Sequence, residues 1–240
     1  MAHVLEIASN SVASALSAQR GGADRIELFD NLAEGGTTPS FGSIALAREQ
    51  LQIPLFVLIR PRPGDFHYDA LERELMLRDI QQCRAQGCDG VVIGALDAEG
   101  NVDVPLCREL VQAAGPMQVT FHRAFDAARD LSEALGDVIS LGCQRLLSSG
   151  GQASAEAGAG VLAALVNRAA GRISVMAGAG ITPGNIAAVA QATGCTELHA
   201  SAKGTRRSDM RFQNHALVGL APDWVATDAD EVAALRAALA

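Results

Sequence analysis

Eight short apolar runs alternate with longer helical segments along this chain, and this alternation constrains the fold more than any other feature. The candidate strands cover residues 4–7, 25–28, 55–59, 90–94, 118–122, 145–149, 173–177 and 197–200. Between them lie segments rich in Ala, Leu, Glu and Arg with helical spacing, such as 69–86 and 155–170. Strands that alternate with helices pair in parallel through right-handed crossovers. Eight such units in 240 residues predict an α/β fold, a (β/α)8 TIM barrel that forms a single domain over residues 1–240.

A weak internal repeat also indicates the barrel. A glycine that ends a helix and opens the next strand recurs at Gly22, Gly87, Gly142 and Gly194, before strands two, four, six and eight. Glycine adopts the left-handed conformation of a helix C-terminus at little cost. The repeat therefore indicates architecture rather than chemistry.

Charge and cysteine usage exclude several classes of partner. The chain has 27 acidic and 19 basic residues, a net charge of −8, which argues against nucleic acid. No apolar run is long enough to span a membrane, and the N-terminus does not resemble a signal peptide. The five cysteines are odd in number and lack CxxC spacing, as expected of buried residues in a reducing compartment. We expect a cytoplasmic protein without a nucleic-acid or membrane partner.

Polar side chains stand where the predicted strands end, and these strand ends form the active-site mouth of a TIM barrel. The candidate catalytic residues are Glu6, Glu27, Arg60, His122 and His199. One interpretation is structural, with Glu6 and Glu27 paired to Arg60 and Arg123, since buried charges are costly unless paired. The other is functional, with acid–base chemistry on an anionic substrate. A divalent metal held by Glu6, Glu27 and His122 also fits these residue types.

Several residues around the same mouth are candidates for binding that substrate: Arg62, Asp65, Arg123, Ser149, Gly178, Gly180, Ser201 and Lys203. Glycine-rich turns expose backbone N–H groups next to a helix N-terminus, which favours phosphate, although tight turns need glycine for steric reasons alone. Thr182 and Pro183 then read as the N-cap and first residue of the next helix. Residues 203–211 read as a solvated basic loop that attracts anions.

Long motifs in the same order resemble the CutC family, described as copper homeostasis proteins, over essentially the whole chain. The matching segments are 5–7, 22–28, 34–40, 60–62, 64–66, 100–103, 119–126 and 176–180. The resemblance implies a (β/α)8 barrel, a cytoplasmic location, a role in copper homeostasis and copper as the ligand.

The chain departs from that family at two positions. Many members carry Cys after the first-strand Glu and after the second-strand Leu, where this chain has Ala8 and Phe29. Because Cu(I) prefers thiolate and thioether ligands, the remaining acids, arginines and histidines favour an oxyanion or a borderline metal.

Two functions therefore stand side by side. One is copper binding in copper homeostasis, and the other is a barrel enzyme acting on a small anionic metabolite, phosphorylated or not. The expected partner is a small anion or a metal ion, no cofactor is specified beyond the copper of the resemblance, and a homo-oligomer through the outer helices is compatible with the sequence.

Overall fold

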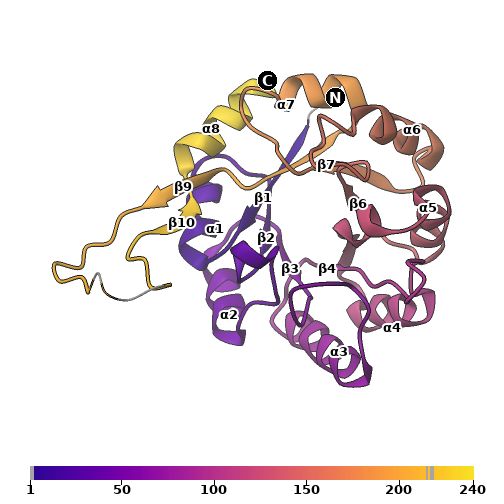
Figure 1. The fold of residues 1–240 in the computed structure, drawn as a ribbon, viewed down its shortest axis with the longest axis horizontal. Coiled ribbons are helices and arrows are strands. Elements are labelled where there is room, and N and C mark those ends of the chain that lie inside the picture. Colours follow the sequence, from indigo (N-terminus) through magenta and orange to yellow (C-terminus); the bar gives the residue numbers. More distant parts are fainter. Residues whose placement is uncertain (1–2, 215, 217–218) are drawn as a thin grey trace.

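The eight predicted strands pair in sequence order and close into a barrel in the computed structural model, which describes residues 3–214, 216 and 219–240 (Figure 1). All the pairs are parallel, and β8 closes the barrel against β1 with Val4 opposite Glu197. The strands are β1 Val4–Ser9, β2 Arg25–Leu28, β3 Leu55–Leu58, β4 Gly90–Ile93, β5 Gln118–Phe121, β6 Arg145–Ser148, β7 Ser174–Gly178 and β8 Glu197–Ala200. The TIM barrel predicted from the sequence is confirmed.

Helices surround the barrel in a ring (Figure 1). They are α1 Val12–Arg20, α2 Phe41–Gln50, α3 Ala70–Ala85, α4 Val104–Ala114, α5 Leu131–Ser140, α6 Ala159–Ala169, α7 Ile186–Thr193 and α8 Ala229–Ala238, with short 3-10 turns at Leu32–Glu34 and Arg123–Ala127. The outward-facing residues of the strands and the inward faces of the helices form the main apolar core, because a parallel sheet must be covered on this side.

The interior of the barrel is different because it contains charged residues. The Phe56 ring fills its lower part between two guanidinium groups, those of Arg25 and Arg145, each 5.1 Å from the ring centroid. A Cβ atom at Gly90 would lie 2.2 Å from this ring, so β4 needs glycine there. Apolar and cationic groups thus share the floor beneath the mouth.

The boundaries differ from the expected ones where the chain turns. The segment 155–158 is not helical, since the Ala155 amide bonds to the Ala179 carbonyl and α6 begins only at Ala159. The expected helix start at Thr182 and Pro183 is wrong. The Asn185 side chain accepts a bond from the Thr182 amide, and α7 starts after this turn.

After β8 the chain leaves the barrel as an antiparallel ribbon, β9 Lys203–Arg206 paired with β10 Trp224–Thr227 (Figure 1). The sequence suggested only a solvated loop here. The chain then returns to the ring as α8. No helix among the described residues combines the length and apolarity needed to cross a bilayer.

Candidate functional site

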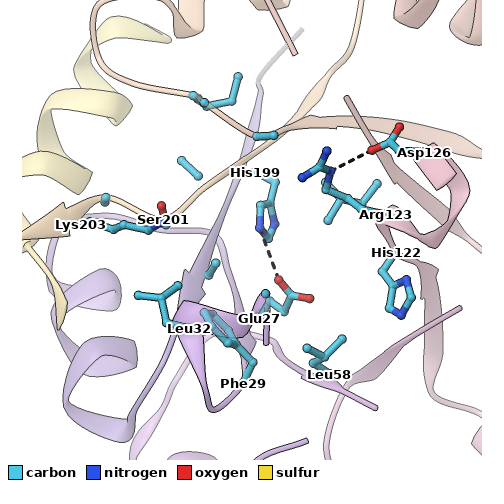
Figure 2. Close-up of a pocket in the computed structure, with 18 of the residues that line it drawn as sticks. Glu27, Phe29, Leu32, Leu58, His122, Arg123, Asp126, His199, Ser201 and Lys203 are labelled. Atoms are coloured by element: carbon cyan, nitrogen blue, oxygen red, sulfur yellow. Dashed lines mark hydrogen bonds and ion pairs between the residues drawn. The ribbon is translucent and has the colours of Figure 1, made fainter. Parts of the chain in front are cut away.

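One imidazole lies between two carboxylates at the centre of the mouth. Nδ1 of His199 is 2.8 Å from Oε1 of Glu6, and Nε2 of His199 is 3.4 Å from Oε2 of Glu27. The strand register produces this arrangement, because Glu6 on β1 stands opposite His199 on β8, and Glu27 stands on the adjacent β2. Figure 2 shows the His199 ring directed at Glu27. The sequence placed these three residues at one rim, and the structure brings them into contact.

The two carboxyl groups have opposite pKa shifts. Burial alone would raise the pKa of Glu6, but the Arg25 guanidinium and His199 lower it to about 2. Glu27 contacts His199 but forms no ion pair with Arg25, so burial raises its pKa to about 7, despite the opposing charge of His199. Burial lowers the pKa of His199, but its hydrogen bond to Glu6 and the charge of Glu27 together raise it above its usual value. At neutral pH Glu6 is therefore ionised, while Glu27 and His199 are poised to exchange a proton.

A buried ionic layer supports Glu6 from below. Arg25 forms ion pairs with Glu6 and with Glu197, the latter at 2.5 Å, and Arg145 bonds to the same Glu197 carboxylate at 2.9 Å. Hydrogen-bonded ion pairs that are removed from water lock their members in one geometry. The layer fixes the Glu6 carboxylate, and through it the orientation of the His199 ring.

A cavity of about 910 Å³ opens above Glu27 and His199. Its walls include Ala8, Phe29, Leu58, Arg60, Phe66, His122, Arg123, Asp126, Gly180, Ser201 and Lys203 (Figure 2). A space of this size holds a small metabolite. Its apolar side comes from β1, β3 and the residue after β2, and Arg60 follows β3 on this side, whereas Arg123 follows β5 and Lys203 follows β8.

Arg60 does not pair with Glu6 or Glu27, so the structural network considered from the sequence is wrong in its partners. Its guanidinium donates to the carbonyls of Glu34 at 3.0 Å, Gly36 at 2.7 Å and Gly64 at 2.8 Å. It thereby ties the loop after β2 to the loop after β3. Arg60 still lines the cavity, but most of its donors serve the loops.

His122 stands apart from the carboxylate pair. Its Nδ1 accepts a bond from the Ala124 amide at 3.0 Å, which assigns the proton to Nε2. Burial and the nearby Arg60 lower its pKa to about 3, so the ring is neutral. Nε2 has no hydrogen-bond partner among the described residues.

Arg62 and Asp65 lie outside the cavity lining and bond to each other at 2.9 Å. Arg62 also bonds to Glu72 at 2.6 Å, so its charge is used within the loop. Both were expected to bind substrate, but the geometry gives them a role in shaping the loop after β3.

Arg123 lines the cavity and is held by two neighbours. Its Nε pairs with Asp126 at 2.8 Å, as Figure 2 shows, and its Nη2 donates to Ser149 at 2.9 Å. Ser149 is fully buried and orients Arg123 rather than lining the cavity.

The last two strands supply the remaining expected residues. Gly180, Ser201 and Lys203 line the cavity, whereas Gly178 lies behind His199, where a Cβ would be 3.3 Å from the His199 Cβ. The non-glycine residues Ala179 and Ala202 both adopt positive φ, 76° and 43°, at this edge. Such strained positions concentrate at functional sites.

The structure changes the expected metal-ligand set. Glu6, Glu27 and His199 offer ligand atoms within 4.8 Å of one another, so His199 takes the place proposed for His122. However, both nitrogens of His199 already face carboxylates, and Arg25 neutralises Glu6. These contacts favour a proton shared between His199 and the carboxylates over a metal ion at this position.

Soft copper ligands do not occur in the cavity wall that the described residues form. All five cysteines are buried and free, and Cys88, Cys143 and Cys195 precede strands at the opposite end of the barrel. The Met176 sulfur lies 3.3 Å from an Arg25 nitrogen in the floor. The donor set therefore does not fit Cu(I).

Sequence reasoning missed the supporting residues Arg25, Arg145, Glu197 and Asp126. Residues two apart on a strand share a face, so Arg25 lies below Glu27 and Glu197 below His199. That period was the signal that could have revealed the three strand residues, whereas Asp126 lies in the 3-10 turn after β5, to which the period does not apply.

Comparison with known proteins gives the family. The CutC family model matches residues 3–204. The chain belongs to the CutC family. A family protein CutC of Chromobacterium violaceum is 54% identical across 100% of this chain and 99% of its own length, and one of Xanthomonas campestris is 52% identical over 95% of each.

A solved relative has the same fold as this chain. It is described as a putative copper homeostasis protein CutC from Streptococcus agalactiae, with 32% identity, a TM-score of 0.80, and coverage of 83% of this chain and 98% of the relative. A thiamine phosphate pyrophosphorylase from Pyrococcus furiosus, 16% identical with a TM-score of 0.61 over 98% of this chain and 95% of its own, shares the fold alone.

Proposed function

We propose that the mouth of the barrel performs acid–base chemistry on a small anionic metabolite, with Glu27 and His199 as the proton-transferring groups. The observation that carries this proposal is the Glu27 carboxyl, which faces His199 in the wall of the cavity and has a pKa of about 7. A group whose pKa lies near the working pH is the most effective general acid or base.

Glu6 and Arg25 are positioning residues in this proposal. Glu6 holds Nδ1 of His199 and stabilises the ring when it is protonated. The arrangement resembles in logic the carboxylate that orients a catalytic histidine in hydrolases. Glu6 itself stays ionised because its pKa is about 2.

The cations in the cavity wall favour an anionic ligand. Arg123 and Lys203 line the cavity on the sides of β5 and β8, and Asp126 and Ser149 hold Arg123 in place. An anion between these cations would project its reacting part toward Glu27. Phosphate sites near the last strands are common in this fold.

Ligand binding tests the proposal. We would measure the shift in Tm with inorganic phosphate and with a panel of phosphorylated and carboxylated metabolites, then follow turnover of each binder by NMR. We expect Glu27→Gln and His199→Asn to abolish turnover of the binder, while Glu74→Gln on the exposed face of α3 leaves it intact. Ligand responses and turnover that are the same in all four proteins would refute the role of the mouth.

A role in copper homeostasis is the second candidate, since the Streptococcus agalactiae relative is described in those words. Carboxylates and imidazole at the mouth suit Cu(II) or Zn(II) better than Cu(I). Titration of the reduced protein with Cu(I) against a chelator, and of the protein with Cu(II), tests this directly. Binding that Glu27→Gln and His199→Asn weaken together would support a metal role for the mouth.

We also propose that the protein is cytoplasmic. All five cysteines are free and buried, as expected in a reducing compartment. Fractionation of cells that express the chain, with immunodetection, tests this location.

A further inference from the structure

The cavity above Glu27 and His199 is much larger than the anion that its cations would hold. Its volume of about 910 Å³ lies in the upper part of the range for pockets that enclose whole organic ligands. An inorganic phosphate, or a carboxylate on a short carbon chain, would leave most of this space to water. The rest of the lining therefore indicates what else the ligand carries.

One side of the cavity is apolar. Four residues line it there, which we call the apolar subsite: Ala8, Phe29, Leu32 and Leu58. Ala8, Phe29 and Leu58 belong to a cluster of buried apolar residues inside the barrel, and Leu32 packs against this cluster. Figure 2 shows Phe29 and Leu58 below Glu27, with Arg123 above it. The barrel interior thus holds the apolar subsite in place beside the acid–base pair.

The polar residues that border the apolar subsite do not offer it a free charge. Arg60 donates to the Gly36 carbonyl at 2.7 Å, and a Cβ at Gly36 would lie only 2.7 Å from Leu58. The same guanidinium also serves two further loop carbonyls and lies 5.2 Å from the centroid of the Phe66 ring. His122 packs against Phe66 at 5.1 Å and is neutral, because burial and Arg60 lower its pKa to about 3. An uncharged, apolar group is therefore favoured here, since a buried charge without a partner is costly.

The cations stand elsewhere in the wall, on the loops after β5 and β8. Asp126 and Ser149 hold Arg123 through Nε at 2.8 Å and Nη2 at 2.9 Å, which leaves Nη1 without a bond inside the described chain. Asp126 also accepts from the amides of Ser149 and Gly151, at 2.9 Å each, so its charge is shared among several donors. Lys203 lines the same cavity. A guanidinium that is already held in place binds an anion at a lower cost in ordering.

We propose that the ligand of the mouth is an anion that also carries an apolar group about the size of a phenyl ring. The anion binds at Arg123 and Lys203, and the apolar group fills the apolar subsite. This inference rests on the proposed function and names the class of ligand that it acts on. Because Glu27 lies between Arg123 and the apolar subsite in Figure 2, the reacting bonds belong to the part of the ligand that joins its two ends.

Leu32 is a specificity-determining residue in this arrangement. It lies on the 3-10 turn after β2, where it lines the cavity and is only partly buried. A substitution there changes the surface that meets the ligand while the buried cluster of the barrel interior keeps its own residues. Leu32 is therefore the member of the apolar subsite best suited to a test.

Pairs of anions with equal charge test the proposal. Phenyl phosphate is compared with methyl phosphate, and phenylacetate with acetate, by calorimetric titration of the full chain. We expect the phenyl compound of each pair to bind about ten- to a hundredfold more tightly, the factor expected for burial of a ring of this size. Equal affinities within both pairs would overturn this inference and leave the acid–base proposal standing, whereas binding of none of the four would overturn both.

Substitutions separate the two ends of the site. Leu32→Ser should reduce the preference for phenyl phosphate severalfold and leave the affinity for methyl phosphate unchanged, which also shows that this variant is folded. Arg123→Gln should weaken both phosphates by a similar factor and keep the preference. Leu71→Ser on α3 is the matched control, because Leu71 is 82% exposed and does not line the cavity. A preference that Leu32→Ser leaves unchanged, or that Arg123→Gln abolishes, would overturn the assignment of the two ends.

Discussion

Nδ1 of His199 lies 2.8 Å from the ionised Glu6 carboxylate, while Nε2 of the same ring faces Glu27 at 3.4 Å. The two carboxylates differ in one respect, which is that Arg25 neutralises Glu6 and no cation other than His199 contacts Glu27 within the described chain. This difference separates their pKa values and assigns them different tasks. Glu6 holds the ring, and Glu27 exchanges protons.

The charge on Glu27 should reduce stability at high pH. Its pKa is about 7 in the folded protein, against 4.5 for a glutamate in water, so the folded state holds a proton that the unfolded state releases. Its contribution to stability is complete below about pH 4.5 and is lost as the pH rises through 7, with an upper limit of roughly 3 kcal/mol. We expect Glu27→Gln to match the wild type at pH 5 and exceed it by about 1–3 kcal/mol at pH 8.5. Urea unfolding at both pH values measures this.

The comparison has a matched control. Glu74→Gln changes an exposed carboxyl on α3 and should leave the difference from wild type the same at both pH values. If the advantage of Glu27→Gln did not grow with pH, the raised pKa of Glu27 would be wrong.

Removal of the Glu6 charge should lower the pKa of His199. The hydrogen bond to Glu6 and the charges of Glu27 and Glu6 raise this pKa against the effect of burial. In Glu6→Gln two of these contributions weaken, so the imidazole should lose its proton at a lower pH than in the wild type. An NMR titration of the ring nitrogens measures the change. An identical His199 titration in both proteins would contradict the proposed role of Glu6.

The architecture was predictable because it depends on a repeated pattern. Eight apolar runs of strand length separated by helical segments allow few alternatives, and each strand lies within two residues of its expected position. The prediction of a helix over 155–158 was wrong because Gly158 packs tightly against Ser149. Local composition cannot show such a tertiary contact. The ribbon of β9 and β10 was not predicted for a similar reason, since its pairing joins Lys203 to Thr227, which are far apart in the sequence.

The site was predictable in membership but not in pairing. The sequence placed Glu6, Glu27 and His199 at one rim, yet it could not show that His199 lies between the two carboxylates. It also assigned Arg60 to an anion or to the carboxylates, whereas the Arg60 guanidinium binds loop carbonyls. Partners of long side chains depend on tertiary packing, which strand positions alone do not determine.

Loss of Arg25 should destabilise the barrel strongly. Arg25 pairs with both Glu6 and Glu197 inside the barrel and stacks on Phe56. Arg25→Met retains the apolar stem but leaves buried carboxylates without their main cation, at a cost of about 3–5 kcal/mol. Urea unfolding at pH 7 measures the loss. Arg78→Met, which breaks the exposed pair with Glu74, should change stability by less than about 0.5 kcal/mol. Equal effects of the two substitutions would refute a stabilising role for the buried ionic layer.

Arg60→Lys should loosen the mouth while the barrel stays folded. The planar guanidinium reaches the carbonyls of Glu34, Gly36 and Gly64 together, whereas a lysine ammonium cannot span both loops. Loss of two charge-assisted bonds should cost about 3–6 kcal/mol locally, because each contributes about 1.5–3 kcal/mol. The amides of the loop after β2 should therefore exchange with deuterium faster, and those of β1 and β8 should not.

The same substitution distinguishes two roles for Arg60. If Arg60 only ties the loops together, anion affinity in Arg60→Lys should fall in proportion to loop opening and recover at low temperature, where the loops close. If Arg60 binds the anion directly, affinity should fall without faster exchange in the loop. Hydrogen exchange and calorimetry on the same protein separate these outcomes, and the three carbonyl contacts lead us to expect the first.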